Sequence, residues 1–163
     1  MAYGGALTQA ILRYKHGRER PLAHPLGSLI LPLVRAAAQT GVDCLCPVPL
    51  HRRRLRERGF NQALEILRIV RRWLSREGQH LDLLGDGIQR VRDTPALGRE
   101  SPAARRRILA GAFSVARPGR VEGRCVLLLD DVMTTGATLA ECTRVLLRAG
   151  AAEVQVAALA RTL

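Results

Sequence analysis

The most regular pattern of apolar and polar residues lies in the last third of the chain. Residues 125–129 form an uninterrupted apolar run, which is typical of a strand covered on both faces. In the segment that follows, apolar residues recur at helical spacing, at Leu139, Cys142, Leu146 and Ala149. Thr138 and Glu141 fit a capping box at its start, and Gly150 is placed to end it. Residues 154–160 are a second apolar run, so we predict a βαβ unit with parallel strands.

Helix and strand patterns also alternate in the first part of the chain. Residues 8–14 and 25–38 predict two helices, and Gly41 is placed to end the second. Residues 42–48 predict a short apolar strand. A third helix is predicted from Asn61, a residue type suited to an N-cap. Its apolar positions recur at helical spacing, at Ala63, Ile66, Leu67, Val70 and Leu74.

The remaining segments carry weaker patterns. Residues 50–62, LHRRRLRERGFNQ, are strongly basic, and we expect a loop there. Residues 78–110 are rich in Gly, Asp, Pro and Arg without clear periodicity, and we expect them to be the least ordered part. Residues 112–115 predict a short strand, followed by a turn at 117–119. The alternation of strands and helices indicates an α/β fold in one domain over residues 1–163.

Composition narrows the class of protein. The chain has 163 residues, of which 47% are hydrophobic and 25% charged, as in ordinary soluble globular proteins. It contains no signal-peptide pattern and no apolar run long enough to span a membrane, so we expect a cytoplasmic protein. The cysteines form no C-x-x-C pair, and we expect buried reduced thiols rather than disulfides or a zinc site. They are Cys44, Cys46, Cys125 and Cys142.

The charge of the chain indicates the class of its partners. Lys and Arg together number 26 against 14 Asp and Glu, a formal net charge of +12, and Lys15 is the only lysine. The planar guanidinium group of arginine suits phosphate oxygens, so a nucleic acid or a phosphorylated small molecule is the natural partner. For any single arginine, a solvated surface position is an equal alternative.

Two adjacent carboxylates follow the first apolar run. If that strand ends at Leu129, Asp130 and Asp131 lie at its carboxyl end, where open α/β sheets bind ligands. The loop 132–138 then leads into a helix start, where free N–H groups favour an anion and Gly136 allows close approach of the backbone. Carboxylates beside a phosphate fit either a bound Mg²⁺ or sugar hydroxyls. A ribose that carries a 5′-phosphate meets both demands.

The stretch VLLLDDVMTTGAT, residues 126–138, resembles the 5-phosphoribosyl-1-pyrophosphate (PRPP) signature of type I phosphoribosyltransferases. Three more stretches, CPVPLHRRRLRERGFNQA, ILRYKHG and the terminal VAALART, resemble the ComF/GntX group of competence-associated phosphoribosyltransferase-like proteins. The resemblance implies the type I phosphoribosyltransferase fold, a mostly parallel sheet flanked by helices with a small hood. Residues 1–40 would then form the hood segment and residues 42–163 the core with the PRPP site.

The resemblance assigns roles to the residues of the signature. It implies that Asp130 and Asp131 bind the ribose hydroxyls of PRPP. It implies that the 5′-phosphate-binding loop consists of Met133, Thr134, Thr135, Gly136, Ala137 and Thr138. Mg²⁺ is implied as the cofactor, bound mainly through PRPP.

Basic residues elsewhere are candidates for binding the pyrophosphate group. In type I enzymes a loop after an earlier strand has this role, and the matching loop here contains Val48, Pro49, His51 and Arg52. Arg52, Arg56 and Arg58 are candidates for neutralising the charge that builds up on departing pyrophosphate, with a solvated surface patch as the alternative. Lys15, within ILRYKHG, is a weaker candidate for reaching the ligand.

Residues 90–107 contain several arginines, including Arg90, Arg92 and Arg105. By resemblance this segment is the mobile loop that closes over PRPP, and a nucleic-acid contact surface or a solvated loop are the alternatives. The chain departs from the group here, because the usual T-P-Q pattern reads Thr94-Pro95-Ala96. The cysteine-rich zinc module usual at the N-terminus of the group has no counterpart in this sequence.

Two functions fit these features. The first is a PRPP-dependent transferase that moves phosphoribose to a nitrogen nucleophile, such as a nucleobase, and releases pyrophosphate. The alternative is a non-catalytic protein that binds PRPP and single-stranded DNA or competence proteins, because the group is associated with DNA uptake. Some purine transferases carry a carboxylate base where Thr134 stands, and this signature supplies none.

Overall fold

The computed structural model of this chain describes residues 5–17, 19–94 and 100–162. Its central sheet has four parallel strands in the order β2-β1-β5-β6. Their bounds are Cys44–Pro47 for β1, Asp82–Leu83 for β2, Cys125–Met133 for β5 and Glu153–Arg161 for β6. Two further strands, β3 (Ile88–Arg90) and β4 (Phe113–Val115), pair antiparallel in a small second sheet.

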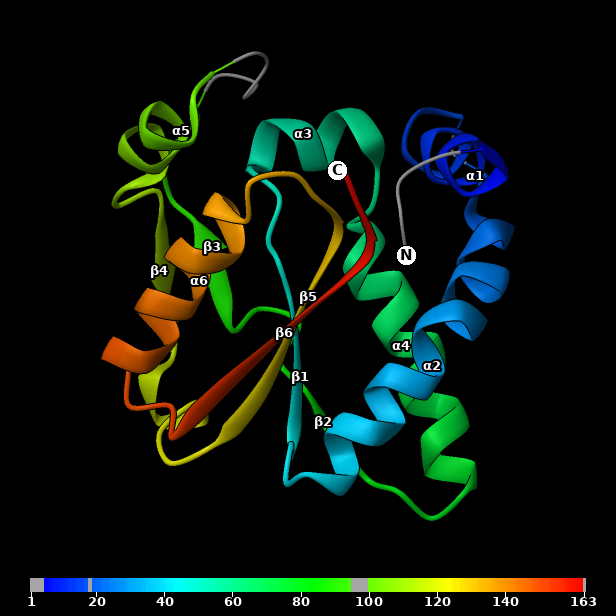
Figure 1. The fold of residues 1–163 in the computed structure, drawn as a ribbon. Coiled ribbons are helices and arrows are strands. Elements are labelled where there is room, and N and C mark those ends of the chain that lie inside the picture. The colour runs from blue at the N-terminus through cyan, green and yellow to red at the C-terminus, as the bar shows by residue number, and fades with distance from the viewer. Residues whose placement is uncertain (1–4, 18, 95–99, 163) are drawn as a thin grey trace.

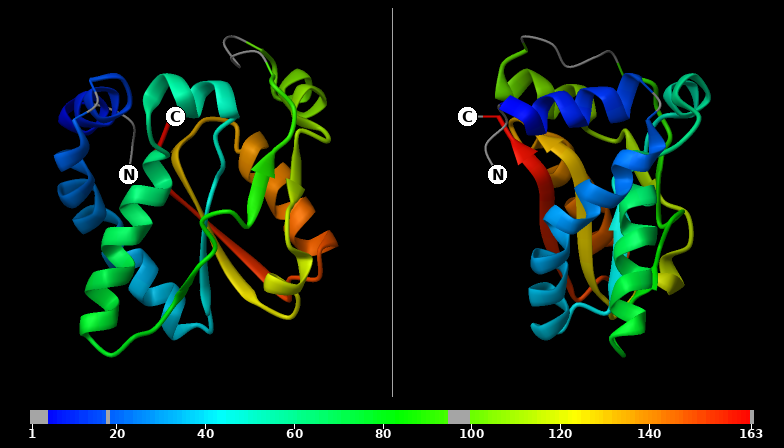
Figure 2. Two further views of the ribbon diagram at one scale, coloured as in Figure 1. Left: turned by 180° about the vertical axis from the view of Figure 1, so that it is seen from behind. Right: turned by 90° about the vertical axis from the view of Figure 1, so that its right-hand side faces the viewer.

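Helices cover both faces of the parallel sheet (Figures 1 and 2). The helices are α1 (Gly5–His16), α2 (Ala23–Gln39), α3 (Arg52–Arg58), α4 (Gln62–Arg76), α5 (Pro102–Leu109) and α6 (Ala137–Arg148), with 3₁₀ turns at Arg20–Leu22 and Pro118–Arg120. The helices α2 and α4 lie on one side, and α6 lies on the other beside the small second sheet. This is the α/β architecture expected from the sequence. None of the described helices is long and apolar enough to cross a membrane.

Side chains of the strands alternate between two apolar cores. In β5, Leu127 and Leu129 belong to the core under α2 and α4, whereas Val126 and Leu128 belong to the core under α6. A strand buried on both faces is apolar at every position, which explains the uninterrupted run in the sequence. The same alternation directs the two aspartates that follow to opposite faces of the sheet.

The cysteines are free thiols built into these cores. Cys44, Cys46 and Cys142 are buried and Cys125 is half-buried. Burial raises the pKa of the Cys44 and Cys46 thiols to about 12, so neither forms the reactive thiolate near neutral pH. The predicted burial is confirmed for Cys44, Cys46 and Cys142.

The strand β5 is longer than its apolar run. It continues through Asp130 and Asp131 to Met133, which pairs with Arg161 of β6, so the predicted end at Leu129 is wrong. Backbone pairing with a nine-residue neighbour, rather than side-chain polarity, decides where β5 ends. Both aspartates are therefore held in strand geometry at the carboxyl end of the sheet.

Two segments that we expected to be irregular contain short helices. In residues 50–62, the His51 side chain accepts a hydrogen bond from a first-turn N–H of α3, and Gly59 ends that helix with a φ of 83°. In residues 78–110, Ser101 caps α5 in the same way, and β2 and β3 are also found there. These elements are too short and too exposed to produce a periodic apolar pattern, so only their capping residues mark them.

One predicted helix start is confirmed and another is wrong. The Asn61 side chain accepts a hydrogen bond from a first-turn N–H of α4 at 3.1 Å, as an N-cap does. The capping box of Thr138 and Glu141 does not form. Instead the Glu141 carboxylate accepts a hydrogen bond from the Gly111 N–H at 2.8 Å and pairs with Arg144. The Gly111 N–H, which is distant in sequence, thus binds the Glu141 carboxylate that the local spacing predicted would cap the helix.

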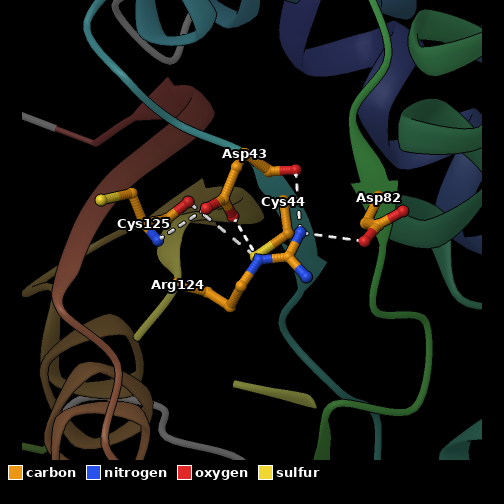
Figure 3. A network of polar contacts seen from close by, with 5 residues as sticks. All are labelled: Asp43, Cys44, Asp82, Arg124 and Cys125. Carbon is orange, nitrogen blue, oxygen red and sulfur yellow. Dashed lines mark hydrogen bonds and ion pairs between the residues drawn. The ribbon is translucent and has the colours of Figure 1, made fainter. Parts of the chain in front are cut away.

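At the amino end of the sheet, one arginine joins three strands (Figure 3). Arg124, just before β5, donates from Nε to Asp43 Oδ1 at 2.8 Å and from Nη2 to Asp82 Oδ2 at 2.9 Å. Asp43 directly precedes β1, and Asp82 begins β2. The hydrogen bonds to Asp43 and Asp82 raise the pKa of the Arg124 guanidinium above its usual value. This cluster serves the fold and lies at the end of the sheet opposite to the candidate site.

We expect the change Arg124→Ala to lower the free energy of unfolding by about 1–2 kcal/mol, because it leaves two carboxylates of adjacent strands without their shared donor. The measurement is urea unfolding at neutral pH and moderate salt. Arg35→Ala is the control, since Arg35 pairs with the exposed Glu77 and its loss should cost less than about 0.5 kcal/mol. Equal losses in the two variants would contradict a special role for Arg124.

Candidate functional site

The turn between β5 and α6 forms the centre of the candidate site (Figure 1). Thr134 and Thr135 are exposed in this turn, and Gly136 has a φ of 73°, a left-handed conformation that glycine adopts without strain. In the described part of the chain no side chain caps the start of α6. The turn borders a hollow of about 20 Å³ lined by Asp130 and residues 132–139. An uncapped helix start beside exposed hydroxyls is suited to an anion such as phosphate.

Asp130 and Asp131 are adjacent but have different surroundings. Asp130 Oδ1 accepts a hydrogen bond from the Asp131 N–H at 2.8 Å. Burial, and then the charge of Asp131, raise the pKa of the Asp130 carboxyl to about 7. Asp131 Oδ1 instead forms an ion pair with Lys15 Nζ at 2.9 Å, and both side chains are less than one-fifth exposed. One carboxyl is thus easily protonated, whereas the other is neutralised by a cation.

Lys15 is held at the site by the residue that precedes it. The Tyr14 hydroxyl donates to the Gln62 carbonyl at 3.3 Å, and its ring centroid lies 5.1 Å from that of Phe60. These buried contacts fix the end of α1 against the start of α4, so the ammonium group reaches β5 from the other end of the chain. The sequence singled out Lys15 as the sole lysine, but no local pattern could show that it meets Asp131.

The loop after β1 is held next to β5. The Val48 N–H donates to the Leu129 carbonyl at 2.8 Å, and the Val48 carbonyl accepts from Asn61 Nδ2 at 2.9 Å. His51, besides capping α3, has its Nδ1 3.3 Å from Asp93 Oδ1. The loop predicted to bind pyrophosphate therefore has a defined position beside the acidic pair. The second hydrogen bond of Asn61 was not predicted, because it joins residues of different elements.

The candidate arginines of α3 do not share one environment. Arg58 is half-buried, and burial lowers the pKa of its guanidinium while the nearby charge of Asp131 raises it. Arg52 and Arg56 are exposed. Arg52 lines, together with Pro49, a separate cleft of about 760 Å³ between α4 and β3. The structure therefore brings Arg58 towards the acidic pair and places Arg52 at the cleft.

Arg105 and Arg90, both predicted on a mobile loop, occupy different positions. Arg105 Nη1 donates to Thr134 Oγ1 at 2.6 Å, which places a cation on the turn predicted to bind the 5′-phosphate. Arg90 donates to Thr94 Oγ1, and its guanidinium lies 5.4 Å from the ring centroid of Phe113. Burial lowers the pKa of Arg90, and the charge of Asp130 is among the nearby groups that raise it.

Arg92 has a different position. Its Nη2 donates to the carbonyls of Ile108 and Ala110 at 2.7 and 2.8 Å, so it ties the end of β3 to the end of α5. These contacts assign Arg92 a bracing role within the segment. Residues 95–99, which include two residues of the predicted T-P-Q-like pattern, lie outside the described residues.

The side chains at the site fit Mg²⁺ only as an ion that arrives with its ligand. Within residues 5–17, 19–94 and 100–162, no group of three or more His, Cys, Asp or Glu side chains could hold a metal ion. Asp130 and Asp131 supply oxygen ligands of the kind that Mg²⁺ prefers, but they face opposite sides of the sheet. Bound PRPP and water would have to supply the remaining ligands.

Comparison with known proteins identifies the general class of protein to which this chain belongs. Residues 62–163 match the family described as phosphoribosyl transferase domain. The solved structure of a glutamine PRPP amidotransferase from B. subtilis aligns with a TM-score of 0.44 and 23% identity, over 82% of this chain and 25% of that chain. The family match extends over more than half of the chain and includes the β5–α6 turn, so the fold is that of the type I phosphoribosyltransferases.

Similar proteins of known name indicate one family within the phosphoribosyltransferase class. The DNA utilization protein YhgH of Escherichia coli O157:H7 is 39% identical over 165 residues, which cover 99% of this chain and 70% of the relative. Competence protein F of Haemophilus influenzae is 34% identical, over 95% of this chain and 68% of the relative. Competence protein ComFC of Bacillus subtilis is 33% identical, over 66% of this chain and 40% of the relative. The chain belongs to the ComF family of phosphoribosyltransferase-like proteins, which confirms the resemblance seen in the sequence.

Proposed function

We propose that this protein binds PRPP at the carboxyl end of β5 and transfers its phosphoribosyl group to a nitrogen nucleophile, with release of pyrophosphate. The observation that carries the proposal is the position of the Asp130–Asp131 pair beside the uncapped start of α6. An anion site next to two carboxylates suits a molecule that has phosphate at one end and hydroxyl donors beside it.

In this arrangement the 5′-phosphate binds the N–H groups at the start of α6, with Thr134, Thr135 and Arg105 as further donors. The ribose hydroxyls donate to Asp130 and Asp131. The attacking nitrogen forms a bond to C1 of the ribose as the bond from C1 to the pyrophosphate oxygen breaks. The negative charge that develops on pyrophosphate is then stabilised by arginines near the site and by Mg²⁺, which supplies electrostatic stabilisation when bound.

Arg58 is the member of the α3 group best placed for the pyrophosphate role. It is half-buried near Asp131, and α3 directly follows the loop that is fixed to β5. Low solvent exposure strengthens the interaction of a cation with developing negative charge. Arg52 and Arg56 are exposed, and any contribution from them is screened by water and salt.

The test of PRPP binding is the thermal unfolding midpoint with and without PRPP and Mg²⁺ at physiological salt. At about 100 times the dissociation constant, PRPP should stabilise the protein by about 2.7 kcal/mol, which raises the midpoint by about 5–10 °C. Ribose 5-phosphate and pyrophosphate, tested separately, are expected to give smaller shifts because each occupies only part of the site. The absence of any shift in the folded protein would overturn the proposal.

A second candidate function is nucleic-acid binding without catalysis. It is favoured by the net charge of +12 and by relatives that are named for DNA utilization and competence. Release of pyrophosphate from PRPP on addition of a nucleobase separates the two functions, because only a transferase produces it. PRPP binding without pyrophosphate release from any base tested would favour the second candidate.

A further inference from the structure

The exposed side of α4 carries a groove lined mostly by arginine. Its volume is about 490 Å³, and its walls are Arg68, Arg71, Arg72, Ser75, Arg76 and Leu83. Arg68, Arg72 and Arg76 are four residues apart, so they form one line along the helix with a spacing of about 6 Å. The left view of Figure 2 shows α4 and the chain leading from β2 to β3 on this side of the molecule.

The positive charges of this groove are largely not neutralised within the protein. Arg68 forms an ion pair with Glu65 at 2.8 Å. For Arg71, Arg72 and Arg76 the described part of the chain provides no ion pair. The acidic residue that follows Arg76 is Glu77, and it is bound by Arg35. Three adjacent guanidinium groups therefore remain available to an outside anion.

The groove adjoins the larger cleft along α4. Arg68 lines both the groove and the 760 Å³ cleft between α4 and β3. That cleft adds the basic residues Arg20, Arg52 and Arg90 to its walls. Of its two acidic residues, Glu65 pairs with Arg68, and Asp86 is partly neutralised by Arg120 at 3.3 Å. Together the groove and the cleft form a basic track that runs along α4 and reaches His51 in the loop after β1.

We propose that this basic track binds the sugar–phosphate backbone of a single-stranded nucleic acid. A line of arginines at regular intervals matches a ligand whose phosphates repeat at regular intervals. A hollow track suits a flexible strand that can bend into it, whereas a stiff duplex would meet mainly its rim. Phe60, which borders the cleft, is buried and offers no face for base stacking, so contacts are to the backbone and binding is independent of base sequence.

The proposal rests on the nucleic-acid candidate given above and does not depend on PRPP binding. The groove lies on the outer side of α4, and its lining residues differ from those of the β5–α6 turn and of the loop after β1, whereas the cleft includes Pro49, His51 and Arg52 of that loop. A variant of the groove should therefore keep its stabilisation by PRPP. A variant of the acidic pair should keep its nucleic-acid affinity. Failure of one function can then be told apart from failure of the other.

The experiment compares Arg71→Glu/Arg72→Glu/Arg76→Glu with the control Arg13→Glu/Arg117→Glu/Arg148→Glu, whose residues line neither the groove nor the cleft. Both variants change the net charge equally, and all six side chains are exposed. Binding of a fluorescent oligothymidylate is measured by anisotropy between about 50 and 200 mM salt. Far-UV circular dichroism and the PRPP shift verify the fold. If the glutamate variant of the groove fails to fold, triple Arg→Gln variants of both the groove and the control replace the pair.

The groove variant should lose affinity at least tenfold more than the control. Its log–log salt dependence should become shallower by about 2, because about 0.7 counterions per lost phosphate contact are no longer released. Equal losses in the two variants would overturn the proposal, since they would show only a general effect of net charge. Tighter binding of a duplex than of the single strand would overturn it as well.

Discussion

Replacement of both Asp130 and Asp131 by asparagine is expected to abolish the stabilisation of this protein by PRPP. Asparagine has nearly the same shape but no negative charge, so hydrogen bonds from ribose hydroxyls lose their charged acceptors, and Mg²⁺ that arrives with PRPP loses two carboxylate neighbours. We expect the affinity for PRPP to fall at least a hundredfold, which corresponds to about 2.7 kcal/mol. Isothermal titration calorimetry and the thermal midpoint both measure this loss.

The matched control is a second pair of aspartates at the opposite end of the same sheet. Asp43→Asn/Asp82→Asn removes the same charge from the Arg124 cluster and should lower stability without changing the PRPP affinity. If the control loses PRPP binding to the same degree, the effect comes from net charge or from a weakened fold. PRPP binding retained by the Asp130→Asn/Asp131→Asn variant would refute the assignment of the ribose site.

The ligand-free protein should become less stable as the pH rises from about 4 to 7, and Asp130→Asn should remove that dependence. The folded pKa of Asp130 is raised to about 7, whereas the unfolded chain releases this proton near pH 4. In this window the folded state binds more protons than the unfolded state, so stability falls with rising pH. The contribution is fully present below about pH 4 and is lost above about pH 7.

Urea unfolding of the wild type and of Asp130→Asn at several pH values measures the difference. At pH 8 the variant should be the more stable protein by about 1–3 kcal/mol, because no charge then has to be buried beside Asp131. The asparagine Oδ1 can still accept the hydrogen bond from the Asp131 N–H, so the local backbone is kept. A difference between the two proteins that does not change with pH would contradict the raised pKa. The stabilising change is also expected to weaken PRPP binding, a common relation at binding sites.

Sequence alone predicted the parts of this fold that local patterns encode. The β5–α6–β6 unit follows from two apolar runs and one helical stripe, and Asn61 caps α4 because its side chain acts within one turn. The predicted end of β5 was wrong, because pairing with β6 continues the strand through charged residues. The capping role of Glu141 was wrong, because a distant backbone N–H competes for the same carboxylate.

The sequence predicted only the part of the candidate site whose residues are neighbours in the chain. The signature placed Asp130, Asp131 and the threonines together because they are neighbours in the chain. The contact of Lys15 with Asp131 depends on how α1 packs against α4, and no spacing encodes that. The arginines of residues 90–107 look alike in sequence, yet Arg105 reaches Thr134 and Arg92 reaches two carbonyls. Tertiary geometry alone distinguishes them.

The ion pair between Lys15 and Asp131 makes the first helix of the chain a reporter of what the site contains. A ligand that takes the Asp131 carboxylate must either displace the Lys15 ammonium group or accept it as a further contact. Since this chain has one lysine, amine-selective acylation modifies a single side chain besides the terminal amine. The rate of that one reaction therefore follows the occupancy of the acidic pair in solution, without any engineered label.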